Sequence, residues 1–188
     1  MQNIRTFIAI ELNYSIHQVL EEILISLKQA NLDAVRWVLP NNIHLTLKFL
    51  GDTPASKIPA ITGAITTSIE NYSPFEIVLD KAGAFPTLKR PRVVWVGLVE
   101  QPLLTQLQKK IDSQIERLGF PTENRPFSAH LTLGRVKNEV SQEQLQKISS
   151  TIANLPPLKP VSMTVNSITI FKSDLRPSGP IYTPLSKI

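Results

Sequence analysis

The short connections between strand-like segments are what most constrain the fold of this chain. Segments 75–85 and 92–99 are rich in the β-branched and aromatic residues typical of strands, and a brief proline-bearing loop separates them. Parallel strands need a crossover of a dozen or more residues, so this connection requires an antiparallel pair. Helical and strand patterns are interspersed without a steady β-α-β rhythm. The sequence therefore predicts an α+β fold with mainly antiparallel sheets.

Apolar spacing and turn residues predict where the individual elements lie. Helices are expected from an N-cap at Ser15 to Leu27, over 57–70, from Leu104 to Leu118, and from an N-cap at Ser141 to Leu155. Strands are expected at 4–12, 35–39, 44–50, 75–85, 92–99, 130–135, 162–172 and about 180–186.

Composition limits the class of protein. The chain contains no cysteine, which excludes disulfides and thiolate metal sites. A formal net charge of +5 over 188 residues mildly favours an anionic partner. The first residues lack a signal-peptide pattern, and no apolar run reaches the ~18 residues of a membrane-spanning helix. We therefore expect a cytoplasmic monomer without a membrane partner, folded as a single two-lobed domain over 1–188.

The tetrapeptide His-Leu-Thr-Leu occurs twice and includes two of the three histidines of the chain. Side chains alternate across a strand, so His44 and Thr46 share one face of the first copy, as His130 and Thr132 do in the second. The leucines can anchor the opposite face of each strand in a core. Duplication of a purely structural strand would also explain the repeat, but it would not by itself favour keeping two polar pairs.

Two histidines suit a reaction that needs one general base and one general acid. In phosphodiester hydrolysis, one imidazole takes a proton from water while the other protonates the departing oxygen. The two threonine hydroxyls would then bind the non-bridging phosphate oxygens. A zinc or di-metal site is disfavoured, because threonine is a poor ligand and each copy offers one histidine. The near-symmetry of the copies leaves open which histidine is the acid.

These residues resemble the two-histidine phosphoesterase superfamily, whose mark is a pair of His-x-Thr-x motifs in which x is hydrophobic. Within it, the chain resembles the bacterial and archaeal RNA 2′,3′-cyclic phosphodiesterases, first named 2′-5′ RNA ligases. The likeness covers nearly the whole chain and is carried by RTFIAIEL, RWVLPNNIHLTLKFLG, GAFPTLKRPRVVWVGL, RPFSAHLTLGR and SDLRPSGPIYTPL.

The resemblance implies a bilobal fold, with two pseudo-symmetric sheets and outer helices flanking a central cleft. It implies hydrolysis of RNA 2′,3′-cyclic phosphate ends to 2′-phosphates without metal or cofactor, and reversible 2′-5′ RNA ligation as a side activity. By position, His44 matches the proton donor, His130 the proton acceptor, and Thr46 and Thr132 the phosphate-binding hydroxyls. Arg135 matches an arginine near the bound nucleotide, although an ordinary surface charge would also fit it.

Other residues have simpler interpretations. Phe7 is a candidate for stacking on a nucleobase, but a core phenylalanine is the plainer interpretation. His17 is expected on the surface of the first helix. Lys89, Arg90 and Arg92 could steer an RNA backbone, and a solvated basic turn is the interpretation we favour.

Two further functions stay open at this point. One is a module that binds RNA ends without turnover, which the intact histidine pair argues against, since binding alone could use arginine or lysine. The other is a phosphodiesterase for another substrate, such as a small cyclic nucleotide or a carrier-linked phosphopantetheine. A panel of substrates separates these possibilities.

Overall fold

The computed structural model of the chain describes residues 2–70, 72–123, 125–177 and 179–188, and it has the α+β class and antiparallel pairing that the sequence predicts. The elements in chain order are β1 (Asn3–Ile10), α1 (Tyr14–Gln29), β2 (Val35–Trp37), a 3₁₀ turn (Pro40–Asn42), β3 (Leu45–Pro54), a second 3₁₀ turn (Ala55–Lys57), α2 (Ile58–Ile69), β4 (Phe75–Thr87), β5 (Arg90–Leu98), α3 (Pro102–Glu116), β6 (His130–Val136), α4 (Gln142–Ala153), β7 (Ser162–Val165), β8 (Thr169–Asp174) and β9 (Ile181–Lys187).

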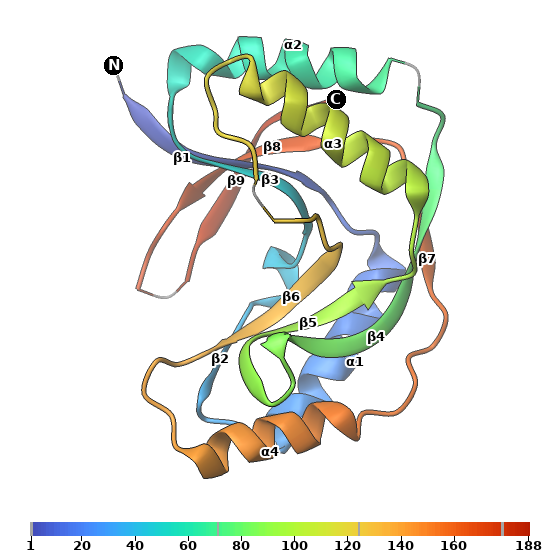
Figure 1. Cartoon of the computed structure of the whole chain (residues 1–188), viewed down its shortest axis with the longest axis vertical. Coiled ribbons are helices and arrows are strands. Elements are labelled where there is room, and N and C mark those ends of the chain that lie inside the picture. The colour runs from blue at the N-terminus through green and yellow to red at the C-terminus, as the bar shows by residue number, and fades with distance from the viewer. Residues whose placement is uncertain (1, 71, 124, 178) are drawn as a thin grey trace.

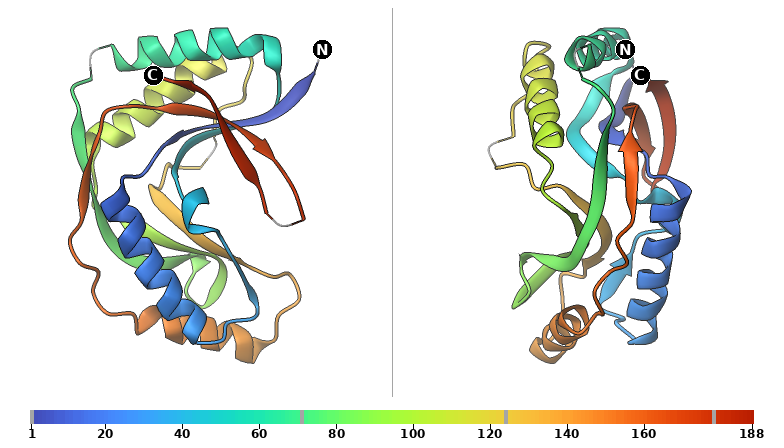
Figure 2. Two further views of the ribbon diagram at one scale, coloured as in Figure 1. Left: turned by 180° about the vertical axis from the view of Figure 1, so that it is seen from behind. Right: turned by 90° about the vertical axis from the view of Figure 1, so that its right-hand side faces the viewer.

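The strands form one curled sheet with helices at both ends of the molecule. Within the described residues the sheet has nine strands, of which eight follow the order β7-β4-β5-β6-β3-β1-β8-β9 and the ninth, β2, pairs with β6. Figure 1 shows an upper half, in which β1, β3, β8 and β9 lie near α2 and α3, and a lower half of β2, β4, β5 and β6 with α1 and α4. Both views of Figure 2 keep the two helix pairs at opposite ends. The two expected sheets are thus halves of one strand order, joined where β3 meets β6.

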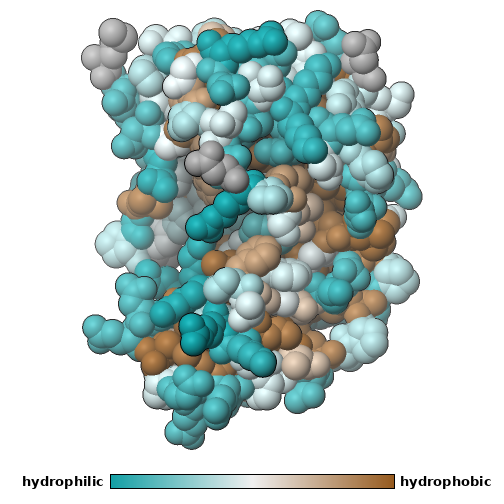
Figure 3. Space-filling view, viewed as in Figure 1, coloured by the Kyte–Doolittle hydropathy of each residue, from teal (hydrophilic) through white to brown (hydrophobic). Residues whose placement is uncertain are grey.

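A shared hydrophobic core connects the two halves. One cluster contains Ile8 and Ile65 from the upper half together with Val94 and Ile148 from the lower half. We therefore propose a single two-lobed domain over 1–188. In the described part of the chain, no helix has the length and apolar character needed to cross a membrane. On the side seen in Figure 3, apolar residues gather in separate patches among hydrophilic ones.

The helices begin where polar side chains can cap them. The predicted N-cap at Ser141 is confirmed: its hydroxyl accepts from the Gln144 amide at 3.1 Å, and the Gln144 side chain accepts from the Ser141 amide at 2.8 Å. The predicted N-cap at Ser15 is wrong. Asn13 caps α1 instead, accepting from the Ile16 amide at 2.9 Å, because the helix starts at Tyr14.

Several strand boundaries differ from the prediction, and β1 and β2 each end two residues earlier than expected. The strand expected to stop at Leu50 continues to Pro54, because Gly51 takes a φ of +68° and carries the chain through an irregularity in the ladder. Strands β4 and β5 extend further toward each other than predicted and leave only residues 88–89 between them. The single strand expected at 162–172 is two strands, β7 and β8, which pair with different partners.

Strand β3 contains a β-bulge within the first His-Leu-Thr-Leu copy. Ala9 of β1 opposes Thr46, and Ile8 opposes Lys48, so Leu47 is an extra residue without a partner in the ladder. Its carbonyl oxygen accepts a hydrogen bond at 3.3 Å from the Gln108 side chain of α3, a residue that is 5% exposed. The helix therefore satisfies the backbone group that the bulge removes from the ladder.

Strand β6 repeats this bulge in the second copy. Trp95 of β5 opposes Thr132, and Val94 opposes Gly134, which leaves Leu133 as the extra residue. The carbonyl oxygen of Leu133 accepts from the Val38 amide at 2.8 Å, just beyond β2. The two copies thus share the same irregularity, with a different element completing the hydrogen bonds of each.

The bulges change which side chains share a face with the motif residues. One extra residue reverses the alternation of the strand beyond it. In β3, Lys48 is therefore buried, whereas Phe49 is 57% exposed. In β6, Gly134 is buried and Arg135 is exposed. Phe49 and Arg135 occupy equivalent places, five residues after His44 and His130.

The buried Lys48 connects β3 to the segment that leads into β6. Its side chain is 1% exposed, and its ammonium group donates to the Asp112 carboxylate of α3 and, at 2.7 Å, to the Pro121 carbonyl. Pro121 begins the connection to β6. A charge buried to this degree requires such partners, because desolvation alone would cost several kcal/mol.

Removing one member of this ion pair should destabilise the fold. We expect Asp112→Ala to lower the free energy of unfolding by about 3 kcal/mol, since it leaves the Lys48 ammonium buried with only a carbonyl partner. Urea unfolding followed by circular dichroism measures this change. Asp52→Ala, at an exposed position, is the control and should have an effect within about 0.5 kcal/mol. The double variant Lys48→Met/Asp112→Leu should recover most of the loss, and failure to do so would argue against an unpaired charge as the cause.

Candidate functional site

One residue pair brings the two His-Leu-Thr-Leu copies together. Leu45 of β3 pairs with Leu131 of β6 in antiparallel register, and both side chains are fully buried. The residues on either side of each leucine face the opposite side of the sheet. In this register the histidine of each copy lies nearest to the threonine of the other copy. Two imidazoles and two hydroxyls are thus arranged with approximate two-fold symmetry.

A cavity of about 510 Å³ opens on this face, between β2, β3, β6 and the β8–β9 hairpin. His44, Thr46 and Thr132 line it. His130 is half-buried and lies beside the cavity rather than in its lining. The lining also includes Arg36, Phe49, Arg135, Arg176 and Tyr182.

The His44 ring is held by its own strand and by aromatic neighbours. Its Nδ1 lies 2.9 Å from the Asn42 carbonyl oxygen, which can only accept, so Nδ1 carries the hydrogen. The ring stacks on Phe7 with centroids 4.6 Å apart and meets Tyr182 edge-on at 5.2 Å. In the neutral ring, Nε2 is therefore the nitrogen with a free lone pair.

His130 is held in the same way in the other half. Its Nδ1 donates to the Ser128 carbonyl oxygen at 2.8 Å, again two residues earlier in the chain. Phe85 of β4 meets the ring edge-on, with centroids 4.9 Å apart. Both histidines thus have a fixed tautomer that leaves Nε2 available for proton transfer.

Burial keeps both imidazoles neutral in the free protein. It lowers the pKa of His44 from its ordinary value of 6.5 to about 4, and the hydrogen bond to Asn42 only partly opposes this shift. Burial also lowers the pKa of His130, and the nearby charge of Arg135 lowers it further. An anion bound between the rings would act in the opposite direction, because it stabilises the imidazolium form.

Cations surround the cavity without neutralising partners. Arg36, Arg135 and Arg176 line it, and none of its described lining residues is Asp or Glu. Burial raises the pKa of the Tyr182 hydroxyl, and the charges of Arg135 and Arg5 oppose that rise, which places both guanidinium groups near it. The cavity is therefore suited to a ligand that carries negative charge.

The structure places Phe7 in the core, which was the plainer of its two interpretations from the sequence. Phe7 is 3% exposed and packs against Phe171 with centroids 5.2 Å apart, as well as against His44, so little of its ring can meet a nucleobase. Phe49 is the exposed aromatic side chain of the cavity, and its ring centroid lies 6.2 Å from that of Phe7. The sequence reasoning missed Phe49, because simple alternation along β3 puts it on the face of the buried leucines.

His17 lies outside the cavity lining and is half-buried, so the expected solvated surface position is wrong in part. Its Nδ1 is a buried nitrogen without a hydrogen-bond partner. Burial lowers its pKa, and a hydrogen bond to the Pro40 backbone partly opposes that effect.

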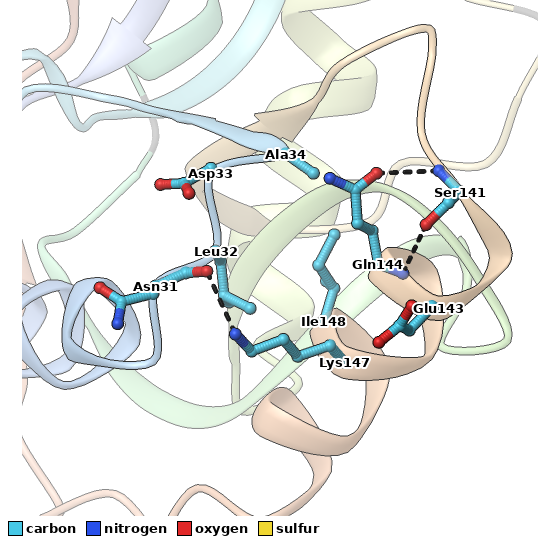
Figure 4. A pocket seen from close by; sticks show the side chains of 9 residues that line it. All are labelled: Asn31, Leu32, Asp33, Ala34, Ser141, Glu143, Gln144, Lys147 and Ile148. Carbon is cyan, nitrogen blue, oxygen red and sulfur yellow. Dashed lines mark hydrogen bonds between the residues drawn. The ribbon is translucent and has the colours of Figure 1, made fainter.

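A second cavity, of about 520 Å³, lies between residues 31–34 and the start of α4 (Figure 4). Several of its polar groups already bond within the protein: Lys147 donates to the Asn31 carbonyl at 3.3 Å, and Ser141 and Gln144 cap α4. Asp33 and Glu143 also line it. This mixed charge and these satisfied partners make it a weaker candidate. Over the described residues, no group of three or more His, Cys, Asp or Glu side chains is placed to hold a metal ion.

Known proteins resemble this chain over nearly its full length. Residues 20–177 match the family model of the 2′-5′ RNA ligase superfamily. An RNA 2′,3′-cyclic phosphodiesterase of Methanothermobacter thermautotrophicus is 35% identical, with 97% of this chain and 96% of that protein covered. One of Archaeoglobus fulgidus is also 35% identical, with 96% of this chain and 97% of that protein covered.

Solved structures agree with this similarity. TT0787 of Thermus thermophilus superimposes with a TM-score of 0.81 at 27% identity, covering 98% of this chain and 96% of that one. Escherichia coli LigT complexed with 3′-AMP gives a TM-score of 0.78 at 31% identity, covering 100% of this chain and 98% of that one.

The lowered pKa of His44 should make stability depend on pH. Between its ordinary value of 6.5 and about 4, the unfolded imidazole takes up a proton that the folded one does not. We therefore expect the free energy of unfolding to decrease as pH falls through this range. His44→Gln, which cannot titrate, should decrease less steeply when urea unfolding is compared at about pH 7 and about pH 5. An equal change in the free energy of unfolding with pH in both proteins would show that His44 is not the source of the pH dependence.

Proposed function

The chain belongs to the 2′-5′ RNA ligase superfamily, and from this premise and the geometry of the cavity we propose that it is an RNA 2′,3′-cyclic phosphodiesterase. The observation that supports this most directly is the pairing of Leu45 with Leu131, which places His44, Thr46 and Thr132 in the lining of one cavity and His130 beside it. The relatives that bear this name cover nearly the full length of the chain.

In the proposed reaction, the paired histidines move both protons. A water oxygen attacks the phosphorus of the terminal cyclic phosphate, and the Nε2 lone pair of His130 takes the water proton. The bond from phosphorus to O3′ breaks, and O3′ receives a proton from Nε2 of His44. The products are a 2′-phosphomonoester and a free 3′-hydroxyl, so atoms and charge balance without another reactant.

The assignment of base and acid rests on the resemblance, because burial lowers the pKa of both histidines. Burial and, to a smaller extent, the charge of Arg135 lower the pKa of His130, which favours the neutral form that a base needs. His44 must be protonated to act as the acid, and its pKa in the free protein is about 4. We infer that the bound phosphodiester anion raises this pKa and so prepares the acid only when substrate is present.

The hydroxyls and the arginine stabilise charge on the phosphoryl oxygens. Thr46 and Thr132 lie on the same face as the two imidazoles and can donate to the non-bridging oxygens. Arg135 is placed at the cavity by the bulge in β6 and can form charge-assisted hydrogen bonds to the same group. These groups and the histidines supply the required proton transfers and charge stabilisation, so we propose that no metal or cofactor takes part.

The terminal nucleobase is proposed to stack on Phe49. Phe49 is 57% exposed and lines the cavity, and base–aromatic stacking contributes about 1–3 kcal/mol per base. Phe7 instead positions His44, because the two rings stack at 4.6 Å. We also propose that a monomer in the cytoplasm carries out this reaction on RNA ends, with reversible 2′-5′ ligation as a side activity.

Loss of either catalytic imidazole should abolish most turnover. We expect His44→Ala and His130→Ala each to lower kcat by about 10²–10⁴-fold on an oligoribonucleotide with a terminal cyclic phosphate, the range contributed by one proton transfer. His17→Ala is the matched control and should stay near wild type. The assay contains EDTA, and product is identified as a 2′-phosphate by chromatography.

Four outcomes would count against this function. Near-normal turnover in both histidine variants would contradict catalysis by a pair of histidines. Loss of activity with EDTA would contradict metal independence. Unchanged RNA affinity with no product after long incubation would favour a binding module. Preference for a small cyclic nucleotide or a carrier-linked phosphodiester over RNA ends would redirect the substrate assignment.

The stacking role of Phe49 makes a separate prediction. Phe49→Leu keeps an apolar side chain but removes the aromatic face, and we expect kcat/KM to fall by about tenfold, mostly through KM. Leu175→Ala is the control, because it truncates another exposed apolar residue of the same cavity. An equal loss in both variants would indicate general packing rather than stacking.

A further inference from the structure

Arg36 and Arg135 form a cross-strand pair of like charges at the edge of the cavity. They oppose each other directly in the β2–β6 ladder, and both line the cavity. Among the described residues, neither guanidinium forms an ion pair with a carboxylate. Like charges placed directly opposite each other destabilise a sheet, so this arrangement favours an anion between or beside them. Arg135 alone is assigned to the reacting phosphate, which leaves Arg36 without a role.

The positions of Phe49 and Arg36 correspond to opposite sides of the reacting phosphate. Strands β3 and β6 run antiparallel through Leu45 and Leu131, so Phe49 lies toward one end of the ladder and Arg135 toward the other. Arg135 follows Thr132 on β6 with the bulged Leu133 between them, whereas Arg36 lies on the neighbouring strand β2, opposite Arg135. Arg135 therefore shares a strand with Thr132, and Arg36 is available for a second phosphate beyond it.

The chemistry of ribose fits this arrangement. In the sugar ring, C1′ carries the base and C4′ carries the 5′ carbon, and these two atoms flank the C2′–C3′ edge on opposite sides. A terminal nucleotide with its cyclic phosphate at the histidines and its base on Phe49 therefore directs its 5′ oxygen toward Arg36. Arg176 of the β8–β9 hairpin lines the same cavity and adds positive charge there.

We propose that Arg36 binds the backbone phosphate on the 5′ side of the terminal nucleotide, a subsite that makes the enzyme prefer oligonucleotide ends over cyclic mononucleotides. This inference rests on the proposed function, since it assumes a cyclic phosphate seated at the histidines. The guanidinium suits the task, because it forms charge-assisted, bidentate hydrogen bonds with phosphate.

Three substrates test the subsite. The first is adenosine 2′,3′-cyclic phosphate, the second is the ApA dinucleotide with the same cyclic end, and the third is that dinucleotide with an uncharged methylphosphonate linkage. In the wild type we expect kcat/KM for the charged dinucleotide to exceed that of the methylphosphonate by about tenfold. Arg36→Gln should bring this ratio close to one and leave the mononucleotide within about twofold of wild type. Arg117→Gln, an exposed arginine after α3, should keep the wild-type ratio.

Two further measurements distinguish a failure of the Arg36 subsite from a failure of the proposed function. The slope of log kcat/KM against log salt for the charged dinucleotide should become shallower by about 0.7 in Arg36→Gln, the value for one phosphate contact on a single strand. If the wild type hydrolyses none of the three, the proposed function fails. Calorimetric titration then tests the subsite by binding alone. The affinity for ApA 2′-phosphate is divided by the affinity for its methylphosphonate analogue, and this ratio is compared between the wild type and Arg36→Gln. A ratio unchanged by Arg36→Gln, in turnover or in binding, would overturn the subsite.

Discussion

The pairing of Leu45 with Leu131 is the contact on which the arrangement of the site depends. It is the residue pair through which β3 and β6 join the two halves of the sheet, and both side chains are fully buried. Because each leucine stands between a histidine and a threonine, a single register fixes the relative places of four polar side chains. A slip of one residue would turn one set of these groups toward the core, where they would lack partners.

The two bulges extend this arrangement beyond the motif. They bring Phe49 and Arg135 onto the face of the histidines, and they do so at equivalent positions in the two halves. The backbone groups that the bulges release are satisfied by Gln108 in one half and by Val38 in the other. The site therefore combines an aromatic ring from one half with a cation from the other, which suits a ligand with a flat base and a charged phosphate.

Much of this could be predicted from the sequence, and the parts that could not depend on partners distant in the chain. Alternation within His-Leu-Thr-Leu correctly placed His44 and Thr46 on one face, since that pattern is local. The bulge at Leu47 is set by pairing with β1, so the exposure of Phe49 and the burial of Lys48 were beyond a local pattern. The prediction of Ser15 as the N-cap was wrong for a local reason, because Asn13 is an equally good capping residue two positions earlier.

The hydrogen bonds from each Nδ1 to a carbonyl two residues earlier have an electrostatic consequence. Many catalytic histidines are oriented by a carboxylate, which also makes the ring more basic. Here a neutral peptide group performs the orientation, so the partner behind each ring carries no negative charge that would repel an incoming phosphodiester. In the mechanism that we propose, the substrate itself then supplies the anion, and His44 becomes protonated as the acid only once the molecule to be cleaved is bound.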